Sequence, residues 1–169
     1  YQYLSKFADP SLLNRIMRSE FRLEWLPKFA QAISKLRPVG TGHMAALGEV
    51  ESPDILVLIA DFLTRVYEIR WVAITGTSDK TAVIVFRGEG ISRDMGHMAH
   101  DKFNALGSAG GHRTMARAEF PVEAIGGKDL ETFVHNTLLG KISLKDLARV
   151  APAAEKKELR PGAEEGKKG

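Results

Sequence analysis

One pentapeptide constrains the fold more than any other part of the chain. Residues 82–86 read Ala-Val-Ile-Val-Phe, with no polar side chain among them. An apolar run of this length that is rich in β-branched residues predicts a strand, and the absence of a polar face indicates that both of its faces are covered. The sequence therefore predicts a central strand in a sheet with other elements packed on it.

The flanking segments predict the remaining elements. Apolar residues that recur at intervals of three and four, and prolines that follow capping residues, indicate helices over residues 10–17, 26–36, 54–66, 92–106 and 129–139. Strands are expected over residues 43–50, 71–75, 81–86 and 115–122. This order predicts an α/β (or α+β) fold, a single domain whose mixed sheet of about four to five strands is flanked by helices.

Three local details complete this secondary-structure prediction. Gly76–Lys80 is expected to form a five-residue hairpin loop between two strands. Ser92 is expected to cap the helix that follows, and Gly107 to end that helix as its C′ residue.

The length of 169 residues and the hydrophobic content of 44% suit one principal domain with a core of its own. We expect a helical linker region over residues 1–40, the principal domain over 41–145 and a polar flexible tail over 146–169, where Pro, Gly, Ala, Glu and Lys predominate. The chain begins at Tyr1 without a methionine, which suggests a part of a longer protein.

Composition excludes several classes of chemistry. The chain has no cysteine, so it has no disulfide, no thiol nucleophile and no Cys-ligated zinc, and a cytoplasmic setting is expected. Its longest apolar run, residues 55–60, is far shorter than the ~18–20 residues of a membrane span, so no membrane association is expected. The net charge of +3 is too small to indicate nucleic-acid binding by itself.

Two clusters invite a metal or acid–base interpretation. Glu49, Glu51 and Asp54 fall within six residues, but an acidic residue in the first turn of a helix and solvated residues at a strand end explain them better. His97 and His100 share a helix face, but no third ligand is evident nearby. We therefore predict no catalytic residue, no metal ligand and no cofactor in this chain.

Positive charge and glycine coincide in one part of the sequence. The pair Gly110-Gly111 is followed directly by His112 and Arg113. Paired glycines let backbone N–H groups approach an anion, and the imidazole and guanidinium can add charge-assisted donors. Arg87 ends the predicted central strand, where sheet proteins often place ligands. These residues indicate a phosphate-binding loop, and the alternative is an ordinary turn with a surface arginine.

Three stretches in this order resemble a known family. They are Val83–Arg87, then Arg93–Ala99, then Gly107–Ala116 with its Gly-Gly-His sequence. Together they resemble the C-terminal DHHA1-type domain of the DHH phosphoesterases, the group that contains RecJ-like exonucleases and the oligoribonuclease and phosphoadenosine-phosphate phosphatases. The resemblance extends from near residue 1 to about residue 139. It departs from the family's commoner four-glycine form at Ser108-Ala109, and Arg117 stands where the family often has glycine.

The resemblance implies that catalysis and substrate binding lie in different domains. In such enzymes a separate N-terminal domain carries an Asp-His-His motif and two manganese ions that activate water. This chain has no Asp-His-His. The resemblance therefore implies that the chain binds short single-stranded nucleic acid or a nucleotide phosphate without catalysis, next to an N-terminal DHH domain of the same polypeptide that holds the manganese. It also makes a homodimer possible.

The same resemblance assigns the substrate contacts, which it places at Gly110, Gly111, His112, Arg113 and Arg87. The alternative interpretation is a free-standing nucleotide-binding or nucleic-acid-binding module that has no catalytic partner domain.

Overall fold

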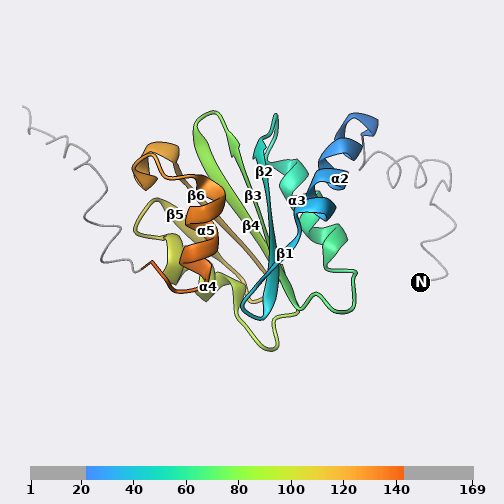
Figure 1. Cartoon of the computed structure of the whole chain (residues 1–169). Helices are drawn as coiled ribbons and strands as arrows, with labels where there is room; N and C mark the ends of the chain where they lie inside the picture. The colour runs from blue at the N-terminus through green and yellow to red at the C-terminus, as the bar shows by residue number, and fades with distance from the viewer. Residues whose placement is uncertain (1–21, 143–169) are drawn as a thin grey trace, which may run out of the picture.

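The computed structural model of the chain describes residues 22–142, and its centre is one six-stranded mixed sheet (Figure 1). The strand order is β1-β2-β3-β4-β6-β5, and β2 and β3 form the one parallel pair within this sheet. The strands are β1 (Arg37–Val39), β2 (Gly42–Glu49), β3 (Trp71–Ser78), β4 (Thr81–Gly88), β5 (Ser108–Gly111) and β6 (Met115–Pro121). The mixed α/β class predicted from the sequence is confirmed.

Helices lie on both sides of the sheet, with α2 and α3 on one side and α4 and α5 on the other (Figure 1). The helices are α2 (Leu26–Lys35), α3 (Asp54–Leu63), α4 (Met95–Phe103) and α5 (Leu130–Leu138), with two 3₁₀ turns, η2 (Leu23–Trp25) and η3 (Val122–Ile125). None of the helices between residues 22 and 142 is long and apolar enough to cross a membrane. The helix predicted over 10–17 and the tail predicted over 146–169 lie outside the described residues.

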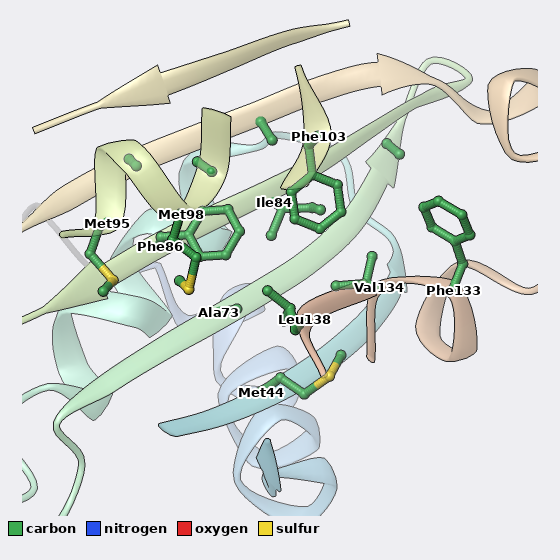
Figure 2. Packing of buried hydrophobic residues seen from close by; sticks show 14 of the residues in the cluster. Met44, Ala73, Ile84, Phe86, Met95, Met98, Phe103, Phe133, Val134 and Leu138 are labelled. Carbon is green, nitrogen blue, oxygen red and sulfur yellow. The ribbon is translucent and has the colours of Figure 1, made fainter. Parts of the chain in front are cut away.

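The central strand predicted from the pentapeptide is β4, and its side chains alternate between two cores. Ile84 and Phe86 belong to the core under α4 and α5, which Figure 2 shows from close by, whereas Val83 and Val85 belong to the core under α2 and α3. All four are at most 1% exposed. Because each face of β4 is covered by a different pair of helices, this strand joins the two cores.

Four phenylalanine rings run through the core beneath α4 and α5. Phe103 stacks on Phe120 with ring centroids 6.0 Å apart, and Phe86 and Phe133 continue the series at 6.0 and 6.3 Å. Offset and edge-on ring contacts of this kind are favourable beyond the burial of their area. They fix α4 against β4 and β6.

Six strands form where four to five were expected, because two short edge strands escaped prediction. Strand β1 has three residues and includes Pro38, and β5 has four residues and includes two glycines. Proline and glycine are both depleted in strands, so neither segment carries the usual signal. Both strands form by pairing with a longer neighbour, β2 or β6.

The five-residue hairpin loop expected between the two strands is wrong. Ser78 pairs with Thr81, so the loop contains two residues, Asp79 and Lys80, with φ of 47° and 63°. Two successive positive φ values match the strand twist of a tight hairpin. The other three residues that were expected in the loop, 76–78, lengthen β3.

The predicted ends of α4 also need correction. Asp94, not Ser92, caps the helix, and its Oδ1 accepts a hydrogen bond from the backbone N–H of His97 at 3.0 Å. Asn104 takes the C-cap position. Gly107 instead allows the backbone to pass close to β6, because a Cβ there would lie 2.2 Å from the carbonyl oxygen of Glu119.

The helices leave one part of the sheet uncovered. Along β6, Ala116, Ala118 and Phe120 are buried beneath α4 and α5, whereas Met115 and Arg117 point to the other side and are exposed. That other side carries α3 over β3 and β4. The β4-β6-β5 corner beside α3 is therefore an open sheet face.

Replacing Lys80 with glycine should stabilise the fold by about 0.5–1 kcal/mol, because glycine adopts positive φ without the steric cost that Lys80 bears. Urea unfolding of the two chains would measure the difference. Thr81→Gly, one residue further in the extended strand, is the control and should lower stability. A lower midpoint for Lys80→Gly would contradict our account of the turn.

Candidate functional site

A cavity of about 300 Å³ lies on the open sheet face beside α3. Its lining comes from four elements and the turn after β5: Val57, Val85, Arg87, Gly110, Gly111, His112, Met115, Ala116 and Arg117. Four of the five residues predicted to bind phosphate are among them, namely Arg87, Gly110, Gly111 and His112. The fold thus brings Arg87 together with a segment more than twenty residues further along the chain.

The segment predicted as a glycine-rich loop is largely an edge strand. Ser108–Gly111 is β5, which pairs antiparallel with β6 so that Gly110 lies opposite Arg117. The backbone N–H of His112 donates to the carbonyl oxygen of Met115 at 2.7 Å. These glycines therefore do not form a concave loop of free N–H groups, because a strand hydrogen-bonds alternate residues to its neighbour.

The two adjacent glycines serve different purposes. A Cβ on Gly110 would meet no atom within 4 Å, and this position shares the cavity side of the sheet with Arg117. Gly111 has φ of 149°, and a Cβ there would lie 2.4 Å from the carbonyl oxygen of Met115. Gly110 therefore leaves space in the cavity, whereas Gly111 is required by the backbone.

The start of α4 holds the residues that follow β5. The backbone N–H groups of Gly96 and Met95 donate to the carbonyl oxygens of His112 and Arg113, at 2.9 and 3.0 Å. A Cβ on Gly96 would lie 2.6 Å from the carbonyl oxygen of Gly111. The first N–H groups of a helix can bind an anion, but here they are hydrogen-bonded to these carbonyl oxygens. The start of α4 therefore positions the site residues and is not itself an anion site.

Sequence reasoning assigned Gly96 no role. The sequence did hold a signal for this role, because Gly96 falls near the start of a predicted helix. Glycine has a low helix propensity, so a glycine there suggests a packing requirement.

Arg113 is the one predicted site residue that does not line the cavity. Its Nε donates to the carbonyl oxygen of Gly90 at 3.1 Å, which ties the turn between β5 and β6 to the loop between β4 and α4. Its charge also acts on the helix cap. The hydrogen bond from the His97 backbone holds the pKa of Asp94 below its usual value, and the Arg113 charge adds to that effect.

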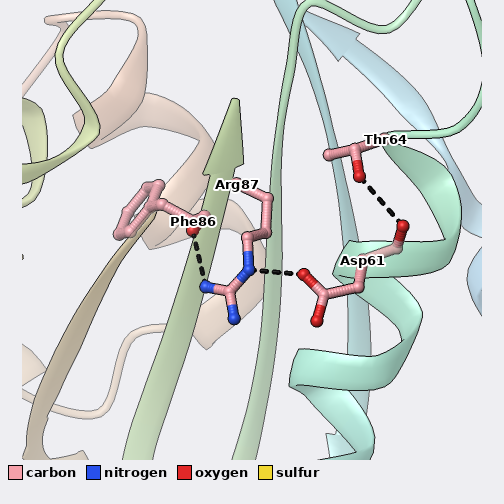
Figure 3. A network of polar contacts seen from close by, with 4 residues as sticks. All are labelled: Asp61, Thr64, Phe86 and Arg87. Atoms are coloured by element: carbon pink, nitrogen blue, oxygen red, sulfur yellow. Dashed lines mark hydrogen bonds and ion pairs between the residues drawn. The ribbon is translucent and has the colours of Figure 1, made fainter. Parts of the chain in front are cut away.

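Arg87, which lines the cavity, is held by the two polar contacts that Figure 3 shows. Its Nε donates to Asp61 Oδ1 at 2.5 Å, and its Nη1 donates to the carbonyl oxygen of Phe86 at 3.1 Å. The side chain is 18% exposed. Within the described part of the chain Nη2 has no hydrogen-bond partner, so this end of the guanidinium is available to an anion.

Arg117 is a site residue that the sequence analysis did not propose. It lines the cavity opposite Gly110 and forms an ion pair with Glu119 on the same strand. The sequence pattern could have indicated Arg117, because the two-residue period of a strand places positions 115, 117 and 119 on one face.

A second cavity, of about 410 Å³, lies at the other end of the sheet. Carboxylates dominate its polar lining, and it contains Glu49 and Glu51 but not the predicted phosphate contacts. Among residues 22–142 no three His, Cys, Asp or Glu side chains are grouped so that they could hold a metal ion. The smaller cavity therefore has the better anion-binding chemistry.

The chain matches no protein-family model. It is 29% identical over 145 residues to an uncharacterized protein of Methanocaldococcus jannaschii, a match that covers 83% of this chain and 30% of that protein. The chain thus spans less than a third of that relative's length.

One solved structure shares the fold. An exopolyphosphatase-related protein from Bacteroides fragilis superposes with a TM-score of 0.63 at 16% identity, over 82% of this chain and 40% of that one. The C-Ala domain of Aquifex aeolicus alanyl-tRNA synthetase has a TM-score of 0.49 and 18% identity, over 63% of this chain and 99% of that one. The first likeness shows that the fold occurs within a longer, exopolyphosphatase-related chain.

Gly111→Ala should destabilise the domain by about 1–3 kcal/mol, because its new methyl group overlaps the β6 backbone. Gly110→Ala, the neighbouring control, should change stability by less than about 1 kcal/mol, because its methyl group enters open space. Chemical denaturation would compare the two. Equal losses would show that the glycines do not differ as the geometry requires.

Asp94 should make folding stability depend on pH in acid. Its pKa is lowered from 3.8 in the folded chain, so the ionised cap stabilises the fold fully above that value and the contribution is lost as pH falls through the folded pKa. Asp94→Asn keeps a capping side chain but cannot titrate. The melting temperature of the variant should therefore fall less than that of the parent between about pH 5 and pH 2. Parallel pH profiles would contradict this.

Proposed function

We propose that this chain is the substrate-binding domain of a phosphoesterase, and that the cavity beside α3 binds a phosphate group of short single-stranded nucleic acid or of a nucleotide. The observation that carries the proposal is the convergence of Arg87, His112 and Gly110 on one open cavity. The DHHA1-type resemblance in the sequence and the fold shared with an exopolyphosphatase-related protein support it.

The chemistry of the lining suits such a ligand. The free end of Arg87 and the exposed imidazole of His112 offer charge-assisted donors to phosphate oxygens. Val57, Val85 and Met115 add an apolar surface for the sugar or base that carries the phosphate.

Backbone and rim complete the proposed site. Gly110 keeps the cavity free of a side chain, because a Cβ there would face open space, and Gly111 contributes its backbone to the lining. Arg113 lies outside the lining with its Nε bonded to Gly90, and we assign it a contact with a ligand that extends beyond the cavity.

Catalysis belongs elsewhere in this proposal. In the family that the sequence resembles, two manganese ions in an N-terminal DHH domain activate water. The residues described here do not group as a metal site, so we assign this chain binding and orientation of the substrate and no step of the chemistry.

Binding of a labelled short oligoribonucleotide tests the proposal. Arg87→Ala should weaken binding on the order of tenfold or more, because a charged donor is lost. Gly110→Val should also weaken it, since its side chain enters the cavity from a strand position that accommodates it. Arg22→Ala is the matched control, because it removes an exposed arginine outside the cavity lining. Fluorescence anisotropy would measure the affinities.

If Arg87→Ala and Gly110→Val bind the oligoribonucleotide as tightly as the parent, the proposed site is wrong. The salt dependence adds a check, because few cationic contacts should give a shallow slope, equivalent to roughly two or three phosphates. The coding sequence upstream of Tyr1 distinguishes the alternative of a free-standing module, since an Asp-His-His motif there is expected only for the phosphoesterase.

A further inference from the structure

Both arginines that line the cavity are already paired with a carboxylate. Arg87 bonds Asp61, and Arg117 forms an ion pair with Glu119. The one other ionisable residue in the lining is His112. The cavity therefore presents arginine N–H groups to a ligand while its fixed charges largely cancel.

From this we infer that Asp61 and Glu119 are specificity-determining residues, and that they restrict the site to one phosphate group of a ligand and disfavour the linked phosphates of pyrophosphate and polyphosphate. The inference rests on the proposed function, because it concerns the same cavity. It names the substrate class more narrowly, as a phosphate ester with one phosphate group at the site.

The physical reason is the different range of two forces. A hydrogen bond from a guanidinium acts at contact distance, and a guanidinium with five N–H donors keeps some of them after pairing with a carboxylate. The Coulomb energy falls only with the inverse of distance, so phosphates that extend beyond the contact depend on the summed field of the site. Pairing each arginine with a carboxylate keeps the donors for one phosphate and removes most of the attraction for further ones.

Asp61 should have the larger effect. In the Arg87–Asp61 pair the side chains are 18% and 48% exposed, whereas in the Arg117–Glu119 pair they are 42% and 41% exposed, so Asp61 neutralises the less exposed of the two arginines. Solvent and salt screen exposed pairs strongly and partly buried pairs less. Asp61 also lies one helical turn beyond Val57, which lines the cavity, so α3 presents its carboxylate beside the ligand space.

A purely structural ion pair would tie α3 to β4 without affecting which phosphates bind. In Figure 3 the Arg87 Nε bonds one carboxylate oxygen of Asp61, and this geometry lets a conservative variant separate the two roles. An asparagine at position 61 can still accept the hydrogen bond from Arg87 Nε, so the guanidinium keeps its orientation while the negative charge disappears.

The test is a titration with inorganic phosphate, pyrophosphate and tripolyphosphate at pH 8, where an ordinary imidazole is neutral. Calorimetry would measure the parent, Asp61→Asn, Glu119→Gln and the double variant. Asp79→Asn with Glu123→Gln is the matched control, because it makes the same change in charge at a different cavity. We expect the parent to bind tripolyphosphate no more than about threefold more tightly than phosphate, since the paired charges leave little field.

Asp61→Asn with Glu119→Gln should raise the preference for tripolyphosphate on the order of tenfold, with most of the gain from Asp61→Asn, while the control pair keeps the parent's preference. The inference is overturned if the parent already prefers tripolyphosphate tenfold, if the double variant keeps the parent's selectivity, or if the control gains equally. Arg87→Ala separates this result from the proposed function. Unchanged oligoribonucleotide binding in that variant refutes the function itself, whereas weakened binding leaves the function standing whichever phosphates the parent prefers.

Discussion

The burial of β4 on both faces is the constraint on which the rest of the structure depends. Val83 and Val85 project beneath α2 and α3, and the two-residue period of the strand carries Arg87 to the same side. Arg87 lies at the edge of the area that α3 covers, so the guanidinium meets Asp61 of α3 on one side and the open cavity on the other. The two-residue period of β4 thus places two valines in the core and Arg87 at the cavity.

The element types were predictable where the hydrophobic pattern is long and regular. The helices at α2, α3, α4 and α5 and the four longer strands have this pattern, because each must cover or occupy a buried layer. The short strands β1 and β5 have no such pattern, since Pro38 and the glycine pair bury almost nothing. The hairpin also escaped prediction, because Asp79 and Lys80 do not form the usual Asp-Gly or Asn-Gly signature of a two-residue turn.

The candidate site was predictable as a set of residues but not as a geometry. Charge and glycine content indicated Arg87, Gly110, Gly111 and His112, and these four line one cavity. The orientation of Arg113 depends on a hydrogen bond to Gly90, more than twenty residues earlier, which no local pattern reveals. Asp61 escaped notice for a similar reason, because a carboxylate on the polar side of a helix is ordinary until the fold places an arginine against it.

Rigidity is the property that unites these contacts. The carbonyl oxygens of His112 and Arg113 are held by the first turn of α4, and the Arg87 guanidinium is held by Asp61 and the Phe86 carbonyl. Donors fixed before a ligand arrives lose little conformational freedom on binding, so a small number of them can suffice. A site with few donors and nearly balanced charge depends on this fixed geometry more than on its field. In the proposed function, the close approach of Gly96 to Gly111 therefore supports binding, because it holds the end of β5 that lines the cavity.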